Sequence, residues 1–221
     1  LLKKIHKTSI GICMNNYKIE SLFPTPVFCT QLGEAISAEQ LDYVQSCSKN
    51  VIINTGRNTS GWDVRVLDNP VMANIKELVQ SSLETYVREI DSPKLDVKPY
   101  ITNSWFNYTT PGQTHHKHFH PNSYLSGVFY INADRESDKI FFHKEGYNRI
   151  YLDTENYNTF NSGSWWYPVG TGDLVLFQSS LQHSVVSTVN TRTRISIAFN
   201  SFLKGQLSGV QSTNEDQYFT I

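Results

Sequence analysis

From about residue 97 onward, the chain consists of short apolar or alternating runs separated by Gly, Pro, Asn and Asp. Runs of this length between turn-forming residues are typical of β-strands, and several in succession favour an antiparallel sandwich or barrel. Aromatic residues make up 13% of the sequence, which also favours β structure. The predicted strands cover residues 100–108, 124–131, 139–142, 174–177, 183–189 and 194–202.

The preceding part of the chain carries the signals of two helices. Ser37 and Gln40 have the spacing of a capping box, and Leu41, Val44 and Cys47 then recur on one helical face. The first helix is therefore expected to begin directly after Ser37.

A second helix is expected to begin at Asn69 and Pro70, a favourable pair for a cap and a first turn, and to end before Pro93. Its apolar positions recur with a period near 3.6. They are Val71, Ile75, Leu78, Val79, Leu83, Tyr86, Val87 and Ile90. The overall expectation is a mainly β fold with flanking helices.

Length and charge restrict the class of protein. The 221 residues suit one domain, and a net charge of −1 argues against an electrostatic nucleic-acid binder. The three cysteines are scattered, which fits a reducing, cytoplasmic setting, and no apolar run is long enough for a membrane span. We expect an N-terminal extension at 1–20, with Met14 as an alternative natural start, a single domain at 21–203 and a tail at 204–221.

Four of the seven histidines lie between residues 115 and 120. Neutral imidazole is the commonest metal-binding side chain, and residues two apart on a strand share a face. His118 and His120 can therefore bind one ion, and His116 can extend the row. The alternative is a histidine group that binds no metal.

Two further candidates follow downstream. His183 comes shortly after a buried strand, and Arg194 and Ser196 share one face of the predicted strand that starts there. A guanidinium directed into a cavity favours a carboxylate partner that accepts two hydrogen bonds. The alternative is an arginine on an edge strand, exposed to solvent.

Taken in order, these motifs resemble the 2-oxoglutarate/Fe(II)-dependent oxygenases, and most closely a small family of such proteins from marine bacteria and phages. The resemblance covers about residues 20–203. The motifs that carry it are Trp105-Phe106-Asn107, His118-Phe119-His120-Pro121-Asn122-Ser123, Leu125-Ser126-Gly127-Val128-Phe129-Tyr130, Gly172-Asp173-Leu174-Val175-Leu176-Phe177, His183 and Arg194-Ile195-Ser196-Ile197-Ala198-Phe199-Asn200.

The resemblance implies a double-stranded β-helix (jelly roll) in which three side chains hold Fe(II). These would be His118, His120 and His183. His120 stands where the superfamily has a carboxylate, and the alternative is a site with two histidines and water in which His120 is only a neighbour. The resemblance also implies that 2-oxoglutarate and O2 are cosubstrates and that a C–H bond is hydroxylated while succinate and CO2 form. The side chains implied near 2-oxoglutarate are Arg194, Ser196, Asn107 and His115.

Two alternatives stay open on the sequence. One is a three-histidine cupin-like metalloenzyme that uses no 2-oxoglutarate. The histidine at position 120 favours this alternative. The other is a jelly-roll binding module without catalysis. The sequence does not identify the substrate, which is a small molecule or a protein side chain. The oligomeric state also stays open, with a homodimer as one option. The role of residues 153–167 is not determined either.

Overall fold

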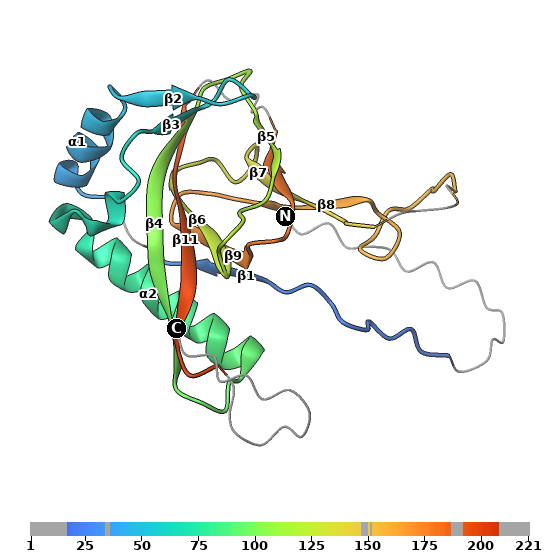
Figure 1. Cartoon of the computed structure of the whole chain (residues 1–221). Coiled ribbons are helices and arrows are strands. Elements are labelled where there is room, and N and C mark those ends of the chain that lie inside the picture. The colour runs from blue at the N-terminus through green and yellow to red at the C-terminus, as the bar shows by residue number, and fades with distance from the viewer. Residues whose placement is uncertain (1–16, 34–35, 147–149, 151, 187–191, 208–221) are drawn as a thin grey trace.

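The computed structural model describes residues 17–33, 36–146, 150, 152–186 and 192–207, and the strands within them form two facing sheets (Figure 1). Over these residues, one sheet has the order β1-β9-β6-β11-β4-β3-β2 and the other has the order β5-β10-β7-β8. The strands are β1 (Val27–Gln31), β2 (Val51–Ile53), β3 (Thr59–Gly61), β4 (Val97–Thr109), β5 (His115–His118), β6 (Leu125–Asn132), β7 (Lys139–His143), β8 (Ser164–Pro168), β9 (Asp173–Gln178), β10 (His183–Val185) and β11 (Arg194–Gly205).

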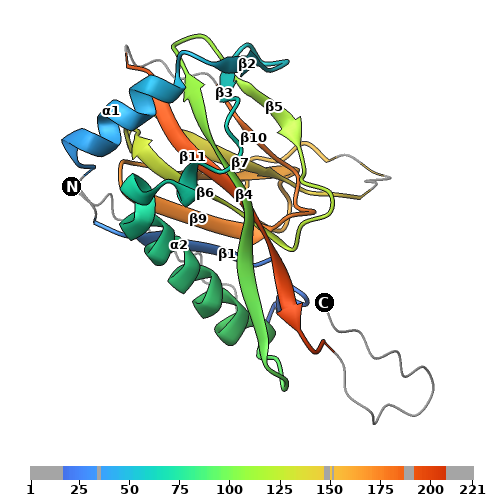
Figure 2. The ribbon, with the colours of Figure 1, turned by 60° about the vertical axis from the view of Figure 1, so that its left-hand side comes forward.

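Strand β9 shows how the larger sheet is covered on both faces. Leu174 and Leu176 pack in the core cluster that contains the apolar side of helix α2, whereas Val175 and Phe177 pack in a second cluster with β7. Successive side chains of a strand point to opposite faces of the sheet. The larger sheet therefore lies between the helices and the smaller sheet, and Figure 2 shows α2 running across its outer face.

Helix α1 (Ala38–Cys47) begins where the capping box predicts. The Ser37 hydroxyl accepts a hydrogen bond from the Gln40 amide at 3.1 Å, and the Gln40 side-chain oxygen accepts one from the Ser37 amide at 3.0 Å. These two bonds satisfy amides that have no partner inside the helix.

The predicted buried face of α1 is only partly right. Val44 is buried and Cys47 is half-buried against the core, but Leu41 is 41% exposed. Gln40 is buried instead. Its polar side chain is satisfied there, because its amide donates a hydrogen bond to the carbonyl oxygen of Val71 at 3.0 Å.

The second helical segment has three parts: a 3₁₀ turn (η2, Pro70–Met72), helix α2 (Ala73–Tyr86) and a π-helical turn (η3, Val87–Asp91). The predicted cap is confirmed, because the Asn69 side chain accepts from the Val71 amide at 3.0 Å. The prediction that Ile90 is buried is wrong, since Ile90 is 49% exposed. The wider π turn rotates the residues that follow it away from a period of 3.6. A further 3₁₀ turn, η1 (Val66–Asp68), precedes this segment.

The mainly β architecture with flanking helices is confirmed. The six predicted strands correspond to β4, β6, β7, β9, β10 and β11, although residues 187–189 of the predicted 183–189 lie outside the described residues. Residues 153–167 contribute to a strand that was not predicted, β8, at the edge of the smaller sheet. None of the helices in the described part of the chain has the length and apolar character that a membrane span requires.

Candidate metal site

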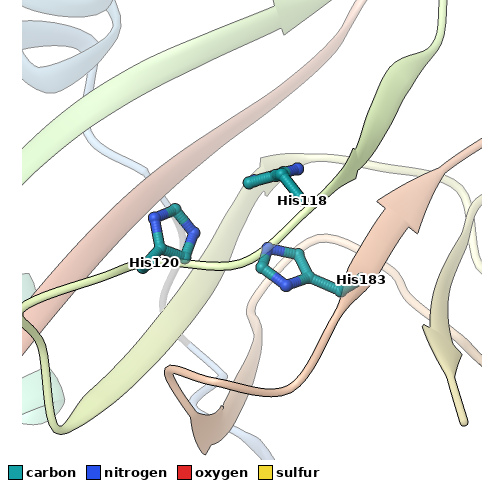
Figure 3. Close-up of side chains that lie close together, drawn as sticks. All are labelled: His118, His120 and His183. Carbon is teal, nitrogen blue, oxygen red and sulfur yellow. The ribbon is translucent and has the colours of Figure 1, made fainter. Parts of the chain in front are cut away.

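His118, His120 and His183 come together between the two sheets (Figure 3). Their candidate ligand atoms all lie within 4.8 Å of one another, and no other such group of His, Cys, Asp or Glu is found in the described residues. His118 on β5 and His183 on β10 are directly paired neighbours in the smaller sheet. Three nitrogen atoms at this separation can bind one metal ion.

The prediction that His118 and His120 share a strand is wrong, because β5 ends at His118. His120 lies in the following connection, where its backbone amide donates to the Ser179 carbonyl oxygen at 2.9 Å. That bond holds the connection against the chain near His183. His116, which was expected to extend the row, is exposed and lies outside the cluster.

Backbone carbonyls orient two of the rings. Nδ1 of His118 lies 2.7 Å from the carbonyl oxygen of His116, and Nδ1 of His183 lies 3.0 Å from that of Leu181. A carbonyl oxygen only accepts, so each Nδ1 carries the proton and each Nε2 keeps its lone pair. Histidines that bind metals are commonly fixed in this way.

The imidazoles are neutral at neutral pH. Burial, followed by the neighbouring histidines, lowers the pKa of His183 to about 2, and burial and His118 lower the pKa of His120 to about 4. Burial also lowers the pKa of His118. Only the neutral form of imidazole binds a metal ion.

A small pocket with an opening to solvent extends from this cluster between the sheets. It is lined by all seven side chains that the resemblance implies around the metal and 2-oxoglutarate: Asn107, His115, His118, His120, His183, Arg194 and Ser196. Strands β4, β6 and β11 form one wall, and β5, β7 and β10 form the other.

Arg194 is not an exposed edge residue, since it is 4% exposed. Its Nη1 donates to Oδ1 of the equally buried Asp138 at 2.9 Å. Its Nη2 is buried and, among the described residues, has no hydrogen-bond partner. A buried donor without an acceptor is costly, so Nη2 offers a binding position for an anion in the pocket.

Tyr130 presents a second such donor. It lines the same pocket and is 1% exposed, and within the described part of the chain its hydroxyl has no partner. Tyr130 is paired with Ser196 across β6 and β11. Burial raises the pKa of Tyr130, so the hydroxyl stays protonated and can donate.

The other nominated side chains have fixed positions. The Ser60 hydroxyl donates to Oδ1 of Asn107 at 2.7 Å, which restrains the Asn107 side chain. Asn107 is paired with Ser196 across β4 and β11. The His115 ring stacks on His118 with centroids 4.4 Å apart, and burial lowers the pKa of His115 to about 3.

Two facing antiparallel sheets that enclose three imidazoles and a buried arginine define a class: a double-stranded β-helix protein with a candidate metal centre. A family model described as "Putative 2OG-Fe(II) oxygenase" matches residues 103–200, the segment that holds all the nominated side chains. The family model confirms the predicted resemblance to 2OG-Fe(II) oxygenases over residues 103–200, and the predicted jelly-roll fold is confirmed because solved structures of such oxygenases share it.

Solved structures share this fold. The chain resembles a prolyl-4-hydroxylase from Pseudomonas putida (TM-score 0.54, 12% identity, 80% of this chain and 92% of that chain covered). It also resembles the epimerase SnoN in complex with Fe3+, alpha ketoglutarate and nogalamycin RO (TM-score 0.54, 10% identity, 89% and 90% covered). A third is HygX from Streptomyces hygroscopicus with nickel, 2-oxoglutarate and hygromycin B (TM-score 0.50, 14% identity, 80% and 82% covered). At such identities the likeness shows the fold alone, and no curated protein matches the chain.

Proposed function

We propose that the protein is a 2-oxoglutarate- and Fe(II)-dependent oxygenase that hydroxylates a C–H bond. The observation that carries the proposal is one pocket that combines three neutral imidazoles with two buried, unsatisfied donors, the Arg194 Nη2 and, within the described chain, the Tyr130 hydroxyl. A diacid with a 2-oxo group at one end and a free carboxylate at the other fits both features.

Three nitrogen donors suit a divalent first-row metal such as Fe(II) and leave further positions open for cosubstrates. His118, His120 and His183 would hold the ion. His120 supplies an imidazole where the typical facial triad has a carboxylate, so the ligand set itself adds no charge to the metal.

The far end of the pocket would hold the distal carboxylate of 2-oxoglutarate. Nη2 of Arg194 and the Tyr130 hydroxyl would both donate to it, and Ser196, which is paired with Tyr130 and lies two residues after Arg194 on β11, would complete the anchor. Asn107 and His115 line the pocket on the way to the metal and would contact the cosubstrate there.

When bound, Fe(II) supplies the activation of O2. The overall reaction balances as 2-oxoglutarate, O2 and a substrate C–H bond giving succinate, CO2 and a C–OH group. The protein's own residues bind and orient the diacid and exclude water around it. The proposed substrate is a small molecule or a protein side chain.

The test measures 2-oxoglutarate binding and succinate formation in the Fe(II)-loaded protein under controlled O2. Arg194→Ala should weaken 2-oxoglutarate binding by about 2–5 kcal/mol, because the charge-assisted pair with the carboxylate is lost. Arg135→Ala is the matched control, since Arg135 pairs with Asp173 outside the pocket lining. Arg194→Ala with wild-type affinity would contradict the proposal.

A second candidate is a three-histidine metalloenzyme that uses no 2-oxoglutarate, and the all-imidazole cluster favours it. The two candidates differ in the requirement for the diacid. Substrate-dependent O2 uptake that proceeds equally well without 2-oxoglutarate would support the second candidate and contradict the first.

A further inference from the structure

Arg194, which lines the pocket, forms a buried ion pair with Asp138, which does not line it. Arg194 is 4% exposed and Asp138 is 3% exposed, and Nη1 and Oδ1 are 2.9 Å apart. Arg194 is the first residue of β11, and Asp138 directly precedes β7 in the other sheet. The pair therefore links the two walls of the pocket.

Asp138 is itself held in place by the backbone. Its Oδ2 accepts from the Asp134 amide at 2.9 Å, and its own amide donates to the Asp134 carbonyl oxygen at 2.7 Å. Its carbonyl oxygen accepts from the Val169 amide at 3.0 Å. Both carboxylate oxygens thus have partners, and the carboxylate cannot turn without breaking one of these contacts.

This arrangement restrains the guanidinium. With Nη1 bound to Asp138, Nη2 is left without a partner in the described chain, and Arg194 lines the pocket. A diacid that is held at the imidazole cluster by one end must reach Nη2 with the other. The place at which Asp138 holds the guanidinium then determines how long that diacid can be.

We propose that Asp138 is a positioning residue that sets the chain length of the diacid cosubstrate by holding Arg194 at a fixed depth in the pocket. This inference rests on the proposed function and adds a determinant of specificity to it. Asp138 does not touch the diacid, because Arg194 lies between them.

The experiment titrates the Ni(II)-loaded protein with three ligands in a calorimeter. These are 2-oxoglutarate, 2-oxoadipate, which is one methylene longer, and pyruvate, which has no distal carboxylate. The wild-type protein should prefer 2-oxoglutarate over 2-oxoadipate by at least about tenfold, since one methylene in a shaped pocket costs roughly that much.

Asp138→Asn keeps the size of the side chain but removes its charge and one of its two acceptor positions. The preference for 2-oxoglutarate over 2-oxoadipate should fall to within about threefold, because a loosened guanidinium follows either carboxylate. Pyruvate affinity should stay within about twofold of the wild-type value, because pyruvate does not reach Arg194.

Asp173→Asn is the matched control. Asp173 is a buried aspartate that pairs with Arg135, and it does not line the pocket. This variant should keep the full preference for 2-oxoglutarate. Loss of that preference in both variants would indicate a general effect of weakening a buried ion pair and would overturn the assignment.

Asp138→Glu gives a second test that preserves the charge. The longer side chain should push the guanidinium into the pocket and shift the preference by about tenfold toward oxaloacetate, which is one methylene shorter than 2-oxoglutarate. Unchanged length preference in the Asn or the Glu variant would overturn the role of Asp138. A wild-type protein that binds neither 2-oxoglutarate nor pyruvate would instead contradict the proposed function.

Discussion

At the scale of single residues, the Tyr130 hydroxyl gives the sharpest test of the anchor. Tyr130→Phe removes one donor to the distal carboxylate and changes little else. A hydrogen bond to a charged group contributes about 1.5–3 kcal/mol, so 2-oxoglutarate affinity should fall about tenfold or more. Calorimetry on the Ni(II)-loaded protein measures this fall.

Tyr86→Phe provides the control for that measurement. The Tyr86 hydroxyl is also buried without a partner in the described chain, but Tyr86 packs in the core beside the helices and does not line the pocket. Its removal should leave 2-oxoglutarate affinity unchanged. Equal losses in the two variants would contradict a specific role for Tyr130.

The sequence predicts part of this site for chemical reasons. Closely spaced histidines and an arginine on a strand face are unusual enough to nominate His118, His120 and Arg194, whereas Asn107 and His115 follow only from the family resemblance. Tyr130 and Asp138 were not nominated. Tyr130 lies within an apolar strand run in which an aromatic residue predicts core packing, and Asp138 before a strand resembles a turn residue. Their roles depend on contacts between distant segments.

At the scale of elements, strand β6 lies between β9 and β11 in the larger sheet, and the packing around Gly127 leaves no room for a side chain. A Cβ atom there would lie 2.6 Å from the Leu176 side chain and would also meet the Phe199 ring. Gly127→Ala should therefore destabilise the protein by about 1–3 kcal/mol through overpacking. Denaturant unfolding of the metal-free protein measures the change.

Gly163→Ala is the matched control for this substitution. A Cβ atom at Gly163 meets nothing within 4 Å, and its backbone is not in the left-handed region. Its free energy of unfolding should stay close to the wild-type value. A Gly127→Ala protein as stable as Gly163→Ala would show that β6 can shift to make room.

The helices and strands differ in how far local patterns define them. The capping box at Ser37 and the Asn69 cap are local features, and both are confirmed. The π turn after Tyr86 and the end of β5 at His118 follow from packing and sheet pairing. Local periodicity therefore predicts the elements but places Ile90 and His120 incorrectly.

At the scale of the whole molecule, the buried imidazoles make the stability of the metal-free protein depend on pH. The pKa of His183 is about 2 in the folded chain, chiefly because of burial, against an ordinary value near 6.5. Below pH 6.5 the unfolded chain takes up a proton that the folded chain does not. The free energy of unfolding should thus have its full value above pH 6.5 and decrease as the pH is lowered below 6.5.

Protonation of His183 in the unfolded chain should lower the free energy of unfolding by about 2 kcal/mol between pH 6.5 and pH 5. His183→Gln removes the titrating group, so its free energy of unfolding should decline less over this interval by that amount. Denaturant titrations at several pH values provide the comparison. An identical decline in the variant and the wild-type protein would contradict a neutral, buried His183.

The central claim is that three imidazoles and Arg194 together hold a metal ion and a diacid. An anaerobic crystal structure with Fe(II) and 2-oxoglutarate tests it most directly. We expect iron bound to His118, His120 and His183, with the distal carboxylate on Nη2 of Arg194 and the Tyr130 hydroxyl. Iron bound without one of these histidines, or a carboxylate bound away from Arg194, would contradict it.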